Sequence, residues 1–270
     1  ALDLLFVVVF HMGIAGAALA TLISQAISAV LVTKALMTSY TILKLRIRYI
    51  RLHRELFQSE FKIGLPSGIQ SCLYAITNII IQTSVNGFGT DVAAAWAAYG
   101  KLDAIFWTIL GAFGIAVTTF AGQNYGAHKY DRVKKSTRIC LFMAFGTSAC
   151  LLTFLVVFCR PLYHIFTSDQ AVIELGVWML KLITPSYILF VFIEILSGSL
   201  RGVGDVIVPT LITLGGVCFV RVPMALILTP MTKDVATLLY SYPISWGATL
   251  LLLLPYYFYQ KKKRLSEDTI

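Results

Sequence analysis

Apolar residues fill seven long stretches of the chain, and short polar connections separate these stretches. About 20 predominantly apolar residues are needed to cross the roughly 30 Å hydrocarbon core of a bilayer as an α-helix. Each stretch meets that length and is too continuously apolar for the alternating strands of a membrane barrel. We therefore expect an all-α polytopic membrane protein without β-sheet. The predicted spans are approximately 13–36, 63–86, 92–121, 137–159, 171–200, 207–229 and 235–259.

The amino-acid composition agrees with a membrane helix bundle. The mean hydropathy is +0.80, and charged residues make up 13% of the chain, which is about half of their usual share in soluble domains. In a soluble protein, the net charge of +9 would indicate a nucleic-acid partner. Here the basic residues concentrate in alternate connections between the spans. This placement indicates membrane topology, and we expect no nucleic-acid partner.

Lys and Arg cluster in three segments, with seven in 34–62, five in 129–138 and four in 261–264. The connections on the opposite side hold only Arg160 and Lys233. Arg201 lies in a connection on the same side as the clusters. Because Lys and Arg are enriched on the cytoplasmic side, one orientation fits every connection. We expect a multi-pass protein of the cell membrane with a cytoplasmic C-terminus. The cytoplasmic segments would be 44–54, 129–138 and 261–270, and the external ones 87–91, 161–170 and 230–234.

The start of the chain predicts a fragment, because Ala1 lies in an apolar run of about half a span, as if a helix began outside this sequence. The longest connection, 38–62, mixes basic and apolar residues as an interfacial amphipathic segment does, and a solvated linker is the alternative. We expect four parts. They are the end of an N-terminal transmembrane lobe (1–37), a basic cytoplasmic linker between lobes (38–62), a C-terminal six-helix lobe (63–259) and a cytoplasmic tail (260–270).

Four short motifs occur at intervals along the chain. They are GIAGAALAT at 13–21, GLPS at 64–67, AGQNYGA at 121–127 before a basic loop, and LRGVGD at 200–205 followed by Pro209. In this order and spacing, they resemble the motifs of the multidrug and toxic compound extrusion (MATE) transporters. The resemblance covers essentially the whole chain.

The resemblance implies a MATE-like helix bundle of twelve spans in two six-helix lobes. This chain would hold the last one and a half helices of the first lobe and one complete six-helix lobe. Its partners would be the missing N-terminal lobe of the same polypeptide, the lipid bilayer and small amphiphilic or cationic substrates. The implied function is a secondary active antiporter that exports drugs or organic cations in exchange for H⁺ or Na⁺ by alternating access. It implies neither an enzyme nor a cofactor.

Two alternatives stay open. A flippase of the same superfamily would move lipid-linked intermediates and would need a strongly cationic cavity for pyrophosphate. Only Lys101, Lys181 and Arg221 are available inside the spans to form one. The other alternative is an inactive truncated membrane protein or a structural subunit without transport activity.

The residues of the LRGVGD motif have a structural explanation. Gly202 and Gly204 flank one residue in a short connection, where glycine permits a tight turn with positive φ. Asp205 follows near the start of the next helix, where an acid is favoured, and Arg201 can pair with it or reach lipid phosphates. We expect these four residues, and Pro66 at the opening of its span, to be structural.

Ionisable residues deep inside the spans indicate a transport pathway, because a charge there is costly unless it is paired or hydrated. We expect Asp103 and Glu194 to couple transport or line a cavity, with Lys101 and Arg221 as charge partners. A salt bridge between Glu194 and Arg221 is geometrically possible, since they lie on consecutive helices. The alternative is that these groups are structural ion pairs. The Cys and His residues are scattered, so we expect no metal site.

The span 63–86 carries polar residues near one face, and we expect Gln70, Tyr74 and Asn78 to line a cavity. Hydrogen bonding between helices is the alternative. The resemblance also implies that the sodium site of the family is not preserved in this lobe, because Tyr74 and Phe190 stand where sodium-coupled members carry acids. The coupling ion, H⁺ or Na⁺, therefore stays open, as does the substrate.

Overall fold

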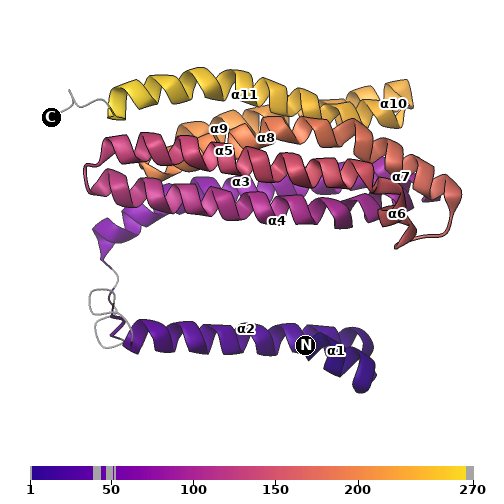
Figure 1. Ribbon diagram of the computed structural model, residues 1–270, viewed down its shortest axis with the longest axis horizontal. Helices are drawn as coiled ribbons and strands as arrows, with labels where there is room; N and C mark the ends of the chain where they lie inside the picture. Colours follow the sequence, from indigo (N-terminus) through magenta and orange to yellow (C-terminus); the bar gives the residue numbers. More distant parts are fainter. Residues whose placement is uncertain (1, 39–43, 47–50, 52, 266–270) are drawn as a thin grey trace. The chain divides into compact units, whose positions relative to one another are not determined.

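The computed structural model describes residues 2–38, 44–46, 51 and 53–265, and every regular element among them is helical (Figure 1). The predicted all-α class is confirmed. The chain divides into two compact units, Ala1–Gln58 and Ser59–Ile270. The predicted four-part division stays a prediction, because much of 38–62 and the end of the tail lie outside the described residues.

The first unit is a long helix with a short helical segment folded back at its start. Met12 N donates a hydrogen bond to Phe6 O at 3.0 Å, and Gly13 takes a φ of 55° in the reversal. A Cβ on Gly16 would lie 3.0 Å from Phe6 O, so glycine permits this close approach. The elements are α1 (Leu2–Leu4), the π-helical turn η1 (Leu5–Val9) and α2 (Gly13–Thr38).

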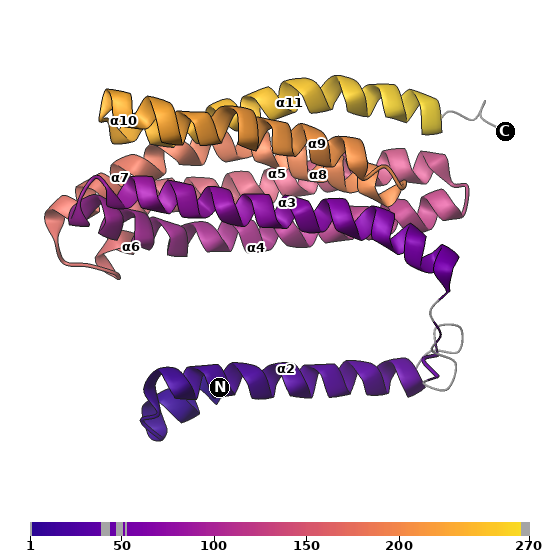
Figure 2. The ribbon, with the colours of Figure 1, turned by 180° about the vertical axis from the view of Figure 1, so that it is seen from behind.

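The second unit is a bundle of long helices that run nearly parallel or antiparallel to one another (Figures 1 and 2). Proline, which lacks the N–H of the helical ladder, accompanies irregular turns at Pro185 and Pro223. The elements are α3 (Arg54–Asn86), α4 (Thr90–Gly126), α5 (Tyr130–Val157), α6 (Cys159–His164), α7 (Gln170–Ile183), η3 (Thr184–Ser186), α8 (Tyr187–Gly202), α9 (Ile207–Gly216), η4 (Val217–Arg221), η5 (Met224–Leu228), α10 (Thr229–Thr232) and α11 (Val235–Leu265).

Six helices in the described part of the chain are long and apolar enough to cross a membrane, and they match six of the seven predicted spans. The seventh, 63–86, is helical within α3 but is not among them, because polar side chains such as Gln70, Asn78 and Gln82 lower its hydropathy. The six are Gly13–Thr38, Thr90–Gly126, Tyr130–Val157, Gln170–Gly202, Ile207–Thr232 and Val235–Leu265.

Pro66 does not open its helix, contrary to the prediction. Helix α3 begins at Arg54, inside the predicted linker, so Pro66 lies in the helix interior. The residues from Arg54 to Pro66 therefore belong to the same helix as the span, and the apolar pattern of this stretch did not locate the start of the helix.

Helices α4 and α8 approach each other closely at two glycines. A Cβ on Gly198 would lie 2.7 Å from Val117 Cγ1, and one on Gly202 would lie 2.6 Å from Thr118 O. The Thr118 hydroxyl donates a hydrogen bond to Gly198 O at 3.0 Å. Small residues let membrane helices pack backbone against backbone. This contact fixes the rotation of α8 against α4, and with it the direction of the charged side chains on both helices.

The connection between α8 and α9 contains the expected tight glycine turn. Gly204 has a φ of 82°, a conformation that glycine adopts without strain. Asp205 does not pair with Arg201, because the Tyr256 hydroxyl of α11 donates to Asp205 Oδ2 at 2.5 Å. The carboxylate therefore ties the turn to the last helix of the bundle.

Candidate functional site

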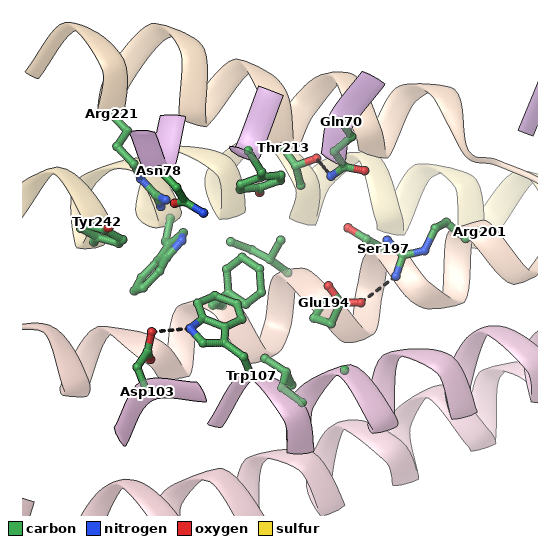
Figure 3. Close-up of a pocket in the computed structure, with 16 residues that line it drawn as sticks. Gln70, Asn78, Asp103, Trp107, Glu194, Ser197, Arg201, Thr213, Arg221 and Tyr242 are labelled. Carbon is green, nitrogen blue, oxygen red and sulfur yellow. Dashed lines mark hydrogen bonds and ion pairs between the residues drawn. The ribbon is translucent and has the colours of Figure 1, made fainter. Parts of the chain in front are cut away.

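A cavity of about 520 Å³ lies inside the second unit, between α3, α4, α8, α9, η4 and α11 (Figure 3). Its wall combines aromatic rings with two carboxylates and two guanidinium groups. Largely apolar cavities with a few convergent polar groups are typical of ligand-binding sites. The lining residues are Gln70, Tyr74, Asn78, Asp103, Trp107, Leu110, Gly111, Phe190, Ile193, Glu194, Ser197, Arg201, Thr213, Arg221, Tyr242 and Trp246.

Asp103, from α4, is held by neutral hydrogen-bond donors. Trp107 Nε1 donates to Asp103 Oδ2 at 2.6 Å, and the Tyr187 hydroxyl donates to Oδ1. Trp107 follows one helical turn after Asp103, so the two side chains meet on one face of α4. The buried Tyr187 hydroxyl also contacts that of Tyr99. Among the described residues, no cationic side chain lies within salt-bridge distance of Asp103.

Glu194 is paired within its own helix. Arg201 Nη2 lies 2.7 Å from Glu194 Oε1, two turns further along α8 and on the same face. The Glu194 side chain is 24% exposed, and the Arg201 side chain is 27% exposed. Gly114 on α4 leaves room for the carboxylate, since a Cβ there would collide with Glu194 Oε1. The salt bridge considered between Glu194 and Arg221 is not formed, because Glu194 meets a guanidinium on its own helix.

The Glu194–Arg201 pair also borders a second, more open hollow. This hollow of about 380 Å³ runs along the glycine-containing face of α4 that includes Gly111 and Gly114. Gly111, Glu194 and Arg201 line both the hollow and the larger cavity. The ion pair therefore stands between the two spaces.

Arg221, at the end of η4, is 4% exposed although it carries a charge. Its Nη2 donates to Ser245 Oγ at 3.0 Å. The guanidinium carbon lies 4.2 Å from the centroid of the Tyr242 ring and 5.5 Å from that of Trp246. Stacking on these aromatic faces stabilises the cation.

Lys101 is exposed and is not among the residues that line this cavity, so its expected role as a charge partner stays a prediction. Two residues along an α-helix correspond to a rotation of about 200°. Because Asp103 lines the cavity, Lys101 must point to nearly the opposite side of α4. Lys181 is exposed as well.

The three polar candidates of α3 all line the cavity. Gln70, Tyr74 and Asn78 follow one another at intervals of four residues, which places them along one helix face. Gln70 Nε2 donates to Thr213 Oγ1 at 3.0 Å (Figure 3). The structure thus brings them together with Asp103 and the two arginines, while their part in substrate binding stays a prediction.

The aromatic wall is the part of the site that sequence reasoning missed. The centroids of Trp107 and Phe190 lie 4.7 Å apart, and those of Phe190 and Trp246 lie 5.6 Å apart. A signal was present in the four-residue spacing of Trp107 from Asp103 and of Trp246 from Tyr242. In a chain this rich in aromatic residues, that spacing does not separate a cavity wall from ordinary packing. No three His, Cys, Asp or Glu side chains gather as a metal site among the described residues.

Comparison with known proteins places these features in a family. The MatE family model matches residues 66–227. The probable multidrug resistance protein YoeA of Bacillus subtilis is 28% identical over 206 residues, which are 76% of this chain and 44% of that protein. The multidrug export protein MepA of Staphylococcus saprophyticus is 24% identical over 228 residues, 80% of this chain and 50% of that protein. The chain thus spans about half the length of the curated relatives it matches.

Solved structures with the same fold are also transporters. A MOP superfamily transporter from Pyrococcus furiosus has a TM-score of 0.88 and 17% identity, over 98% of this chain and 60% of that one. A multidrug resistance MATE family transporter in an outward-facing conformation has a TM-score of 0.87 and 17% identity, over 97% and 59%. Likeness at this identity shows the fold, and the family model covers more than half of the chain. The chain therefore belongs to the MatE family of multi-pass membrane transporters.

Proposed function

We propose that the protein containing this chain is a secondary active antiporter that exports drugs or organic cations across the cell membrane in exchange for H⁺ or Na⁺. The observation that carries the proposal is the cavity of about 520 Å³ inside a bundle of membrane-spanning helices. A cavity of this size accommodates a drug-sized ligand. The names of YoeA and MepA, which refer to multidrug resistance and multidrug export, support the same class of substrate.

The wall of the cavity suits the recognition of varied amphiphilic cations. Trp107, Phe190 and Trp246 offer flat apolar faces that also attract cations. Asp103 adds a carboxylate without a cationic partner among the described residues. One carboxylate holds a proton, a sodium ion or the cationic group of a substrate. Competition among these cations for one site would link export of the substrate to entry of the ion.

The proposed transport cycle is alternating access. Sites of secondary transporters lie between two repeats, and rocking of one repeat against the other changes the side on which the site opens. In this proposal, an N-terminal lobe of the same polypeptide faces the six-helix lobe, consistent with a chain that spans about half the length of its relatives. The basic connections and the C-terminus would lie in the cytoplasm.

The charges of the cavity favour the antiporter over the flippase alternative. A flippase for lipid-linked pyrophosphate would need a strongly cationic cavity. Lys101 and Lys181 are exposed, and the lining residues contain two arginines together with Asp103 and Glu194. The cavity of this lobe therefore carries balanced formal charge, which suits an amphiphile better than a pyrophosphate.

The test is ion-driven movement of a cationic dye by the intact protein in proteoliposomes. Ethidium transport would be measured under a pH gradient without Na⁺, under a Na⁺ gradient at equal pH, and with no gradient. We expect uphill ethidium movement under one of the two gradients, which would also identify the coupling ion. Absence of movement under both gradients would contradict the antiporter. Movement of a fluorescent anionic lipid in place of ethidium would favour the flippase.

A further inference from the structure

We propose that Arg221 is a recognition site for a carboxylate group on the substrate. The cavity would then take amphiphiles that carry a cationic group and a carboxylate together. The inference concerns the substrate of the proposed antiporter, so it rests on the proposed function. It begins from the charge of Arg221, which has no counter-ion among the described residues.

Arg221 is a buried charge without a counter-ion. Its side chain is 4% exposed, and none of the described carboxylates lies within salt-bridge distance of it. The desolvation of an ionised group is costly unless an opposite charge or full hydrogen bonding compensates for it. Asp103 and Glu194, the two acids of the cavity, contact other groups. A ligand with an anionic oxygen would supply the compensation that this lobe does not.

The hydrogen-bonding capacity of Arg221 is only partly used. A guanidinium has five N–H donors in a planar fork, and Arg221 directs Nε and Nη2 to the same Ser245 hydroxyl, at 3.3 and 3.0 Å. Among the described residues, Nη1 has no hydrogen-bond acceptor. Stacking over Tyr242 covers the flat face of the guanidinium. An acceptor would therefore approach its edge, which carries the N–H donors. That edge matches the two oxygens of a carboxylate.

The neighbourhood of Arg221 fits a ligand with two opposite charges. In Figure 3, the Asn78 amide lies beside the guanidinium, and Asp103 lies on the opposite side of the cavity. The Trp246 ring lies against Arg221 and packs on Trp107, whose Nε1 donates to Asp103, so the two rings connect the charged groups. A carboxylate at Arg221 would place the apolar body of a ligand against the rings. The cationic end would then reach toward Asp103.

The experiment compares rhodamine B with its ethyl ester, which differ only in the free carboxylate. Binding of each dye to the intact purified protein would be measured by fluorescence anisotropy. We expect the free acid to bind about tenfold more tightly than the ester, because a charge-assisted bidentate pair is lost in the ester. Arg221→Met should remove this preference by weakening the binding of the acid and leaving that of the ester nearly unchanged.

Two further variants separate recognition from folding. Ser245→Ala removes the neutral hydrogen-bond acceptor of Arg221 and should keep the preference for the acid. Arg160→Met removes an exposed arginine that lies outside the cavity and pairs with Glu174. This variant should bind both dyes as the parental protein does. If Arg221→Met does not fold, the ratio of acid to ester affinity in the parental protein still tests the inference.

Equal affinities of the parental protein for the acid and the ester would overturn the inference, and Arg221 would then be a structural stacking residue. An equal loss of affinity for both dyes in folded Arg221→Met would also overturn the inference. If the ester is exported under an ion gradient while the acid has no advantage, the proposed function stands and this inference fails. If the protein neither binds nor moves either dye, both fail.

Discussion

At the scale of single residues, Asp103 is the group on which coupling should depend most. Its carboxylate has neutral donors and, among the described residues, no cationic partner. We expect Asp103→Asn to reduce ion-driven ethidium transport by about tenfold or more, because the amide keeps the shape and loses the charge. Expression should stay near the parental level. Initial transport rates in proteoliposomes would measure the effect.

The matched control for Asp103 is Asp91→Asn, which alters an exposed acid in the first turn of the same helix. This variant should transport at the parental rate. If Asp103→Asn did so as well across the neutral pH range, Asp103 would be structural and coupling would lie elsewhere in the protein.

Glu194 should contribute less to coupling and more to stability, because Arg201 already neutralises it. Glu194→Gln leaves the partly buried guanidinium without its counter-ion, and we expect a loss of about 1–3 kcal/mol in stability with a smaller transport defect than that of Asp103→Asn. Thermal unfolding in detergent would measure the first effect. The comparison variant is Glu174→Gln, whose ion pair with Arg160 is more than half exposed and should matter little. Equal unfolding temperatures for the two variants would refute this assignment.

At the scale of elements, the contact between α4 and α8 determines the shape of the site. A methyl group at Gly202 would lie 2.6 Å from Thr118 O, and neither backbone can move away cheaply. We expect Gly202→Ala to destabilise the protein by about 1–3 kcal/mol, as overpacking does. Gly146→Ala on α5, where no atom lies within 4 Å of a new Cβ, should be neutral in the same thermal unfolding assay. A Gly202→Ala protein as stable as the parent would show that α4 and α8 can move apart at this contact at little cost.

Sequence patterns predicted most of these elements but not all of their properties. The apolar stretches identified the helices because hydropathy over about 20 residues depends only on local composition. The helical spacing of Leu56, Phe57 and Phe61 fits the predicted interfacial amphipathic segment, but it did not show that this segment and the following span form one helix from Arg54. The polarity of α3 has its explanation in the cavity that Gln70, Tyr74 and Asn78 line.

At the scale of the whole molecule, the basic connections predict one orientation in the membrane. The connection between α4 and α5 lies at the same end of the second unit as the end of α11 (Figure 1). In a background without the five native cysteines, we expect Arg132→Cys to react with an impermeant maleimide only after permeabilisation of the cells. Ser168→Cys, in the predicted external connection before α7, should react in intact cells. The reverse labelling pattern would overturn the orientation.

The sequence by itself determined which segments are membrane helices and which residues carry costly charges inside them. Both follow from local composition and from the price of placing an ion in hydrocarbon. Only the tertiary structure decided that Glu194 pairs with Arg201, that Lys101 faces away from the cavity, and that aromatic rings of three helices form its wall. These outcomes depend on how far each helix is rotated about its axis. That rotation is fixed by long-range contacts, such as the glycine contacts of α8 with α4, which no local pattern specifies.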